Sequence, residues 1–142
     1  MTVSELHAAL KEKSISEDRY FLHGLYGATD DNEKVSLTIR KGKYRIEYET
    51  YFTERGEKHA IRVFFTESAA CEYIYGLLID EDLFLRIQKI EGLSAMTVNE
   101  RLFASGLIDE FEQVKEKDRR RAGKILRWLG VDEASIDRIV KK

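Results

Sequence analysis

The hydrophobic pattern of this chain changes its period partway along, and that change limits the possible folds more than any other feature. In residues 35–52, apolar and polar side chains alternate on both sides of a short glycine-containing turn, with the second strand beginning at Tyr44. A period of two around a tight turn predicts a β-hairpin with one buried face. A second turn at residues 53–57 leads to the apolar run 60–65. The pattern therefore predicts three consecutive antiparallel strands, with residues 20–23 as a fourth.

From residue 66 onward the apolar residues recur at helical spacing. Residues 66–68 have the composition of a helix start, and the apolar residues within 70–78 form one helical face. Residues 3–13 predict a further short helix at the beginning of the chain. Residues 81–91 fit both a strand and a helix, and we favour a short helical or irregular segment. The change of period predicts helices packed against the strands.

Residues 92–96 are the best candidate for a boundary, because everything after them reads as helical. Thr97 and Glu100 form a capping box, and Gly106 suits the end of that helix. Further helices are predicted after Gly106, after Asp118 and after Asp132. The predicted fold is α+β: a small antiparallel meander of three or four strands with helices on one face, then an all-helical module. The predicted domains are 1–94 and 95–142, which could also form one continuous domain.

The charge balance and the single cysteine exclude several classes of protein. The chain has 24 Lys and Arg against 26 Asp and Glu, which gives no electrostatic case for sequence-independent nucleic-acid binding. No apolar run approaches the roughly 20 residues that a membrane helix needs. The first residues lack the apolar region of a signal peptide. Cys71 is the only cysteine and makes no internal disulfide, so we expect a cytoplasmic protein.

The sequence shows no arrangement of residues that predicts catalysis, a metal site or a cofactor site. His7, His23 and His59 lie on separate predicted elements, and no pair of cysteines has metal-binding spacing. Cys71 is followed by Glu72, whose charge would raise the pKa of the thiol, so we expect a buried structural cysteine. No phosphate-binding glycine motif occurs. We therefore expect a binding protein rather than an enzyme; a deep pocket with a perturbed carboxylate would favour an enzyme instead.

A group of acidic residues and one tyrosine forms the leading candidate for a binding surface. Glu47 and Glu49 share the outward face of the predicted hairpin, and Tyr51 follows them on that face. Glu54 and Glu57 lie in the next turn. A tyrosine offers a large rigid contact area with a polar tip, and acidic groups complement a basic partner. Most such residues in proteins are simply solvated, so this surface is a hypothesis about where a partner binds.

A basic run provides the alternative. Arg119, Arg120 and Arg121 are followed by Lys124 and Arg127 on one predicted helix. Such a run is most often a solvated helix face, in which acidic neighbours pair with the bases. The alternative hypothesis is a nucleic-acid-binding or regulatory module that uses the helix around Arg119–Arg127.

Two stretches resemble known bacterial families. Residues 97–139 resemble a helical tail found on small bacterial proteins of unassigned function, which carries the motifs N-E-R-L, S-G-L and D-E-F in this order. Residues 55–78 resemble the strand–helix unit of immunity proteins from bacterial polymorphic-toxin and contact-dependent-inhibition systems. The shared feature is an apolar strand followed by an A-C-E-Y-x-Y helix, here Ala70–Tyr75. Both sets of motifs consist of apolar and capping residues.

The resemblance implies an immunity protein, or antitoxin, that neutralises a cognate toxin domain by binding it. Immunity families diverge at their binding surfaces, so the resemblance assigns no functional residue. Toxin nucleases carry basic clefts for nucleic acid, and an acidic surface would complement such a cleft. We therefore expect Glu47, Glu49, Tyr51, Glu54 and Glu57 to contact the toxin. The sequence leaves open which toxin is bound and whether the chain forms oligomers.

Overall fold

The computed structural model describes residues 1–140 and divides the chain into two compact units, Met1–Asp82 and Leu83–Lys142. We call them the sheet unit and the helical unit, and each has its own hydrophobic core. Helix α2 (Glu67–Gln88) begins in the sheet unit and ends in the helical unit. The sequence placed the boundary between residues 94 and 95. The structure divides the chain within α2, because Leu83 and Ile87 pack in the core of the helical unit.

The sheet unit contains helix α1 (Val3–Glu12), most of α2 and one mixed sheet. The strands are β1 (Tyr20–Leu22), β2 (Tyr26–Gly27), β3 (Val35–Lys41), β4 (Ile46–Glu54) and β5 (Glu57–Phe64), in the spatial order β2-β1-β3-β4-β5. The predicted α+β class is confirmed. The sheet differs from the predicted antiparallel meander because β1 pairs with β3 in parallel. Residues 23–34 contain the short strand β2 and a loop that returns the chain, as a parallel neighbour requires.

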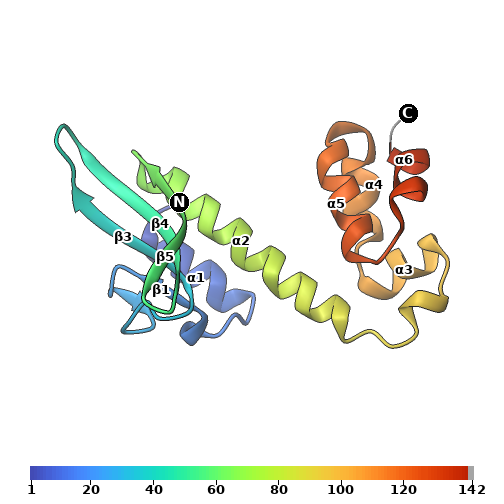
Figure 1. Cartoon of the computed structure of the whole chain (residues 1–142), viewed down its shortest axis with the longest axis horizontal. Helices are drawn as coiled ribbons and strands as arrows, with labels where there is room; N and C mark the ends of the chain where they lie inside the picture. The colour runs from blue at the N-terminus through green and yellow to red at the C-terminus, as the bar shows by residue number, and fades with distance from the viewer. Residues whose placement is uncertain (141–142) are drawn as a thin grey trace. The chain divides into compact units, whose positions relative to one another are not determined.

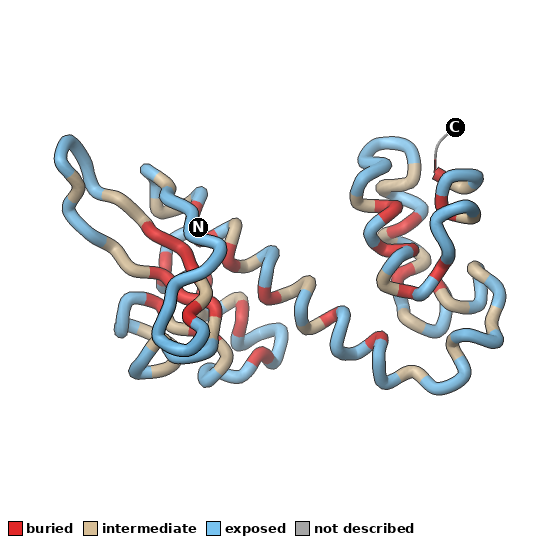
Figure 2. The backbone as a smooth tube through the Cα atoms, viewed as in Figure 1, coloured by how far each residue is buried: buried red, intermediate tan, exposed pale blue. Residues whose placement is uncertain are grey.

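The two faces of the sheet have different roles. Strand β3 directs Val35 and Leu37 into the core, where they meet buried residues of α1 and α2. The helices therefore cover one face of the sheet, as predicted (Figure 1). The tip of the β3–β4 hairpin is exposed, while the buried stretches of both strands lie nearer the helices (Figure 2). Tyr44, predicted to begin a strand, lies in the turn between β3 and β4 and is 85% exposed.

Helix α2 resolves the ambiguity at residues 81–91. Its start is capped, since the Thr66 hydroxyl accepts a hydrogen bond from the backbone N–H of Ala69 at 3.1 Å. The helix then continues without a break to Gln88. The helical interpretation of this segment is confirmed, but it is the end of one long helix rather than a separate short one. Leu83 and Ile87 have the i, i+4 spacing of one helical face and are both buried.

The helical unit contains the end of α2 and four short helices. They are α3 (Val98–Ser105), α4 (Ile108–Lys117), α5 (Arg119–Trp128) and α6 (Glu133–Val140). The predicted capping box of Thr97 and Glu100 is present, and Gly106 ends α3 in the left-handed conformation. Asp118 caps α5 by accepting a hydrogen bond from the N–H of Arg121 at 3.0 Å. None of the helices in residues 1–140 combines the length and the apolar character needed to cross a bilayer.

Candidate binding surfaces

Three of the five predicted contact residues lie on the face of the sheet opposite the helices. In the register of β3 and β4, Arg40 is opposite Glu47, Thr38 is opposite Glu49, and Ser36 is opposite Tyr51. The alternation of the sequence therefore assigned Glu47, Glu49 and Tyr51 to the outward face correctly. Their availability to a partner depends on what covers this face.

Glu49 and Tyr51 are buried, which differs from the solvated surface that the sequence suggested. Glu49 is 6% exposed and accepts hydrogen bonds from Lys58 Nζ at 2.6 Å and Arg40 Nη1 at 2.7 Å. Tyr51 is 4% exposed and its hydroxyl donates to Asp31 Oδ2 at 2.8 Å. The Lys58 ammonium lies 4.4 Å from the centre of the Tyr51 ring. These residues are therefore parts of an internal polar network.

Glu47 belongs to the same network. Its carboxylate accepts a hydrogen bond from Arg40 Nε at 2.9 Å, while Arg40 also contacts Glu49. Two acidic and two basic side chains thus neutralise one another on this face. The expected acidic patch is absent here, because Arg40 and Lys58 come from neighbouring strand positions that the sequence pattern alone does not bring together.

The pKa values of this network follow from its burial and its ion pairs. Burial disfavours the charged form of Glu49, but the hydrogen bonds from Lys58 and Arg40 outweigh it, so the pKa of Glu49 is lowered from 4.5. Burial raises the pKa of Tyr51 to about 12, and the carboxylate of Asp31 contributes to the rise. At neutral pH Glu49 is therefore an ionised acceptor and Tyr51 a neutral donor.

Replacing Glu49 with glutamine is expected to destabilise the sheet unit by about 1–2 kcal/mol at pH 7, because two charge-assisted hydrogen bonds lose their anionic acceptor. Because the pKa of Glu49 is lowered in the folded state, the stability that its carboxylate contributes is present above pH 4.5. This stability is lost as the pH falls through the folded-state pKa. The stabilities of wild type and variant should therefore converge in acid. Denaturant titrations of wild type and variant, at pH 7 and at an acidic pH below the folded-state pKa of Glu49, measure this difference in stability.

The control Glu47→Gln, with one contact to the half-exposed Arg40, should change stability by less than about 1 kcal/mol. Equal stability of wild type and Glu49→Gln at pH 7 would contradict the description of this network.

The remaining two predicted contact residues, Glu54 and Glu57, are exposed at the turn between β4 and β5. They face one another as partners in the strand register. Neither has an ion-pair partner within residues 1–140. Two like charges directly opposite one another destabilise a strand pair. The turn thus carries a local electrostatic cost that no described intramolecular contact offsets.

A third carboxylate, Glu33, lies at the same end of the sheet. It accepts a hydrogen bond from the backbone N–H of Arg55 at 3.3 Å, which ties the loop before β3 to the β4–β5 turn. The side chain of Arg55 is exposed in the same turn. We define the acidic turn as Glu33, Glu54 and Glu57.

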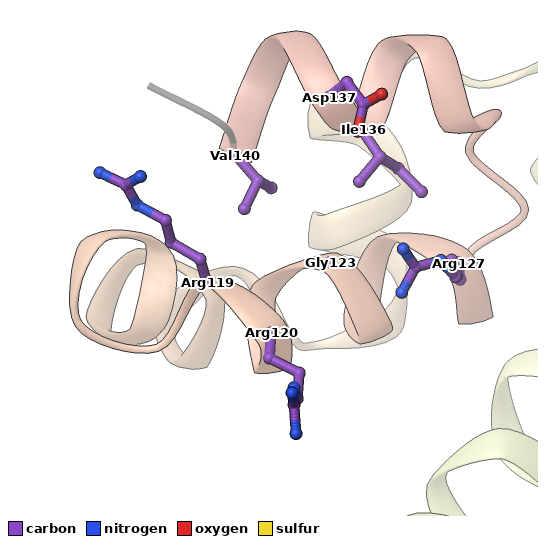
Figure 3. A pocket seen from close by; sticks show the side chains of 7 residues that line it. All are labelled: Arg119, Arg120, Gly123, Arg127, Ile136, Asp137 and Val140. Carbon is purple, nitrogen blue, oxygen red and sulfur yellow. The ribbon is translucent and has the colours of Figure 1, made fainter.

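The basic run of the helical unit lines a groove between α5 and α6 with a volume of about 380 Å³. Figure 3 shows Ile136 and Val140 projecting from α6 toward α5, where Gly123 leaves space. Arg119 lies at one end and Arg127 at the other, while the side chain of Arg120 projects away from α6, and Asp137 of α6 also lines the groove. The groove therefore has an apolar middle, an arginine at each end and one acidic residue on the α6 side.

Several basic residues of the run have acidic or aromatic partners. Arg121 Nε contacts Glu110 at 2.8 Å, and Arg127 Nε contacts Glu133 at 2.8 Å. Lys124 lies over the ring of Trp128 at 5.2 Å. Arg119 and Arg120 are exposed and have no ion pair within residues 1–140. Much of the basic run is thus a paired helix face, as its charge pattern suggested.

Cys71 and two of the histidines are held by contacts within the fold. Cys71 is buried, as predicted, and burial together with the charge of Glu67 raises the pKa of its thiol to about 11. His7 contacts Glu17 at 2.7 Å, and His23 accepts a hydrogen bond from the N–H of Ile39 at 3.0 Å. In residues 1–140 no three His, Cys, Asp or Glu side chains are grouped so that they could hold a metal.

One further surface, the free edge of the sheet at β5, was not predicted from the sequence. Ile61, Val63 and Phe65 are exposed there. The sequence pattern predicted a strand for this apolar run, but it did not predict whether the strand lies at the edge or in the middle of the sheet. A signal was present, because the run follows two longer alternating strands and precedes a helix. The last strand of such a series lies at an edge unless another segment returns to cover it.

Comparison of the chain with models of protein families, with curated proteins and with solved structures finds no match.

Proposed function

We propose that this chain is an immunity protein that binds a cognate bacterial toxin domain and blocks its active site. The observation that carries the proposal is the acidic turn, in which Glu54 and Glu57 are exposed, opposite one another and unpaired in the described part of the chain. The resemblance of residues 55–78 to the strand–helix unit of immunity proteins supports the same function. The proposed partner has a basic active-site cleft, as a nuclease does.

The contact surface proposed from the structure is narrower than the one expected from the sequence. Glu49 and Tyr51 are buried, and Glu47 is paired with Arg40. Reversing the charge of Glu49 would disrupt the polar network of the sheet, so a loss of binding in that variant would not identify a contact. Glu54 and Glu57 can be changed without removing a side-chain hydrogen bond to any residue that the structure describes.

The acidic turn can contribute to binding in two ways. Unpaired carboxylates accelerate association with a basic cleft through long-range attraction, which salt screens. When a guanidinium of the partner then lies between Glu54 and Glu57, the repulsion between the two carboxylates is relieved in the complex. The function therefore predicts an affinity that depends on both residues and falls with ionic strength.

The test uses the full chain and a candidate toxin domain, taken from the C-terminal end of a large protein if a neighbouring gene encodes one. Isothermal titration calorimetry should give a one-to-one complex for the wild type. The double variant Glu54→Lys/Glu57→Lys should bind at least about tenfold more weakly, which corresponds to ~1.4 kcal/mol. The effect should shrink at high salt.

A matched control separates contact from net charge. Glu12→Lys/Asp18→Lys changes the net charge by the same amount at two exposed positions of the sheet unit. This control should change the affinity much less than the turn variant does. Equal weakening by the two double variants, or no weakening by the turn variant, would remove the acidic turn from the binding site.

A second candidate function is the binding of a nucleic acid by the helical unit. The observation that favours it is the pair of exposed arginines, Arg119 and Arg120, without ion pairs in the described residues. Fluorescence anisotropy with a labelled single-stranded oligonucleotide at low salt tests it, with Arg119→Glu/Arg120→Glu as the variant. Binding that weakens with salt and is lost in the variant supports this function, and no binding at low salt excludes it.

A further inference from the structure

The edge strand β5 leaves one side of its backbone without a strand neighbour. It is the last strand in the order β2-β1-β3-β4-β5, and no other strand of residues 1–140 pairs with it apart from β4. The opposite edge is formed by β2, which has only two residues. An exposed edge offers N–H and C=O groups to any further strand, and proteins usually block such edges. The β5 edge is therefore the long available edge of the sheet.

The second half of β5 is also apolar on its outward side. Ile61 is 51% exposed, Val63 is 38% exposed, and Phe65, the residue after the strand, is 53% exposed. The register places Val63 opposite Glu49, whose side chain lies on the outward face. By alternation Ile61 and Phe65 lie on the same side as Val63. We call Ile61, Val63 and Phe65 the edge patch.

We propose that β5 pairs antiparallel with β5 of a second copy of this chain, with the two Val63 residues opposite one another. In this register Ile61 lies opposite Phe65 of the second copy, so the outward side of the interface consists of apolar pairs throughout. On the inner side Arg62 lies opposite Phe64 of the second copy. A guanidinium over an aromatic ring is a favourable pairing, and Arg62 already lies 4.9 Å from the ring centre of Tyr73.

Charge disfavours the symmetric register centred one residue earlier. If the two-fold axis passed through Arg62 instead of Val63, two arginines would lie directly opposite one another, which destabilises a strand pair. An axis through Ile61 would place Arg62 opposite Ala60, where the left-handed backbone at φ 52° and the shifted pairing with β4 interrupt the regular strand. The segment from Ile61 to Phe65 is thus self-complementary about Val63.

The pairing is compatible with the proposed function and does not depend on it. It uses residues 61–65 and leaves the acidic turn at the other end of β5 free. A short strand pair buries less area than the ~1,600 Å² of a standard interface, so we expect a weak dimer with a dissociation constant in the micromolar range or above.

Cysteine cross-linking of the full chain tests the register. Val63→Cys places two thiols on directly opposed residues, whose Cα atoms are about 4.5–5.5 Å apart, within the span of a disulfide. Ile61→Cys alone is the matched control. Its two thiols would be offset by four positions, roughly 14 Å along the strands, although Ile61 is the more exposed residue. The native Cys71 is buried and does not compete.

Under mild oxidation, Val63→Cys should form disulfide-linked dimers about tenfold faster than Ile61→Cys, because only the first pair of thiols is within disulfide distance. An equimolar mixture of Ile61→Cys and Phe65→Cys should form mixed dimers that neither variant forms alone. Equal rates for Val63→Cys and Ile61→Cys, or no dimer with Val63→Cys, would overturn the proposal.

A charge-pair experiment gives an independent readout in solution. Sedimentation equilibrium should show that Val63→Lys and Val63→Glu are each monomeric at concentrations where the wild type forms dimers. Mixing the two variants should restore dimers, because the opposite charges then meet at the two-fold axis. Failure of the mixture to associate while the wild type does would place the interface elsewhere.

Discussion

Replacing Leu37 with alanine is expected to lower the free energy of unfolding of the sheet unit by about 2–5 kcal/mol. Leu37 is fully buried on β3, between the strand β4 and the helices α1 and α2. The substitution removes apolar contacts and leaves a cavity in the core of the sheet unit. A protein of this size commonly has a total stability of only ~5–15 kcal/mol, so the loss is a large fraction of it.

Hydrogen exchange of the full chain, read by mass spectrometry, locates this effect. Peptides from β1, β3 and α1 should lose protection, while peptides from α4, α5 and α6 should keep it, because the two units have separate cores. The control Ile46→Ala removes an apolar side chain that is exposed at the start of β4, and it should change stability by less than about 0.5 kcal/mol. Equal loss of protection throughout residues 1–140 would show that the chain unfolds as one cooperative unit.

Replacing Arg101 with alanine is expected to destabilise the helical unit by about 2–3 kcal/mol. The guanidinium donates hydrogen bonds to the backbone carbonyls of Ser94 at 3.1 Å, Met96 at 3.1 Å and Leu129 at 3.0 Å. It thereby joins the segment before α3 to the end of α5. Removing it leaves three carbonyl groups without this donor.

The conservative variant Arg101→Lys should recover less than half of the lost stability. A lysine keeps the charge but lacks the planar group that reaches three acceptors at once. Thermal unfolding followed by the fluorescence of Trp128, the only tryptophan, reports on this unit directly. Arg138→Ala, which removes an exposed contact with Ser135, should have little effect. An Arg101→Lys variant as stable as wild type would show that charge alone, and not the three hydrogen bonds, holds these segments.

The parts of the fold that local patterns encode were predictable. The capping box of Thr97 and Glu100, the left-handed glycine at Gly106 and the alternation of β3 and β4 depend on residues within a few positions of one another, and each was found as expected. The parallel pairing of β1 with β3 was not predictable in this way. It depends on the path of residues 23–34, and no pattern of neighbouring residues indicates beside which strand that loop places β3.

In the candidate site, too, local patterns were predictable and contacts between separate segments were not. Alternation assigned Glu49 and Tyr51 to the outward face, but it carries no information about what lies over that face. Asp31, 20 residues before Tyr51, and Lys58, on the next strand, complete the network that buries both residues. Glu54 and Glu57 were predictable as exposed, because they lie in a tight turn whose composition alone indicates solvent.

Stoichiometric inhibition is the measurement that tests the proposed function most directly. The full chain is titrated into the purified cognate toxin domain while the activity of that domain is followed. For a nuclease, the activity is the cleavage of nucleic acid. The account predicts that activity falls to background at one equivalent of wild-type chain and that the Glu54→Lys/Glu57→Lys variant requires a clear excess. Full toxin activity in the presence of excess wild-type chain would contradict it.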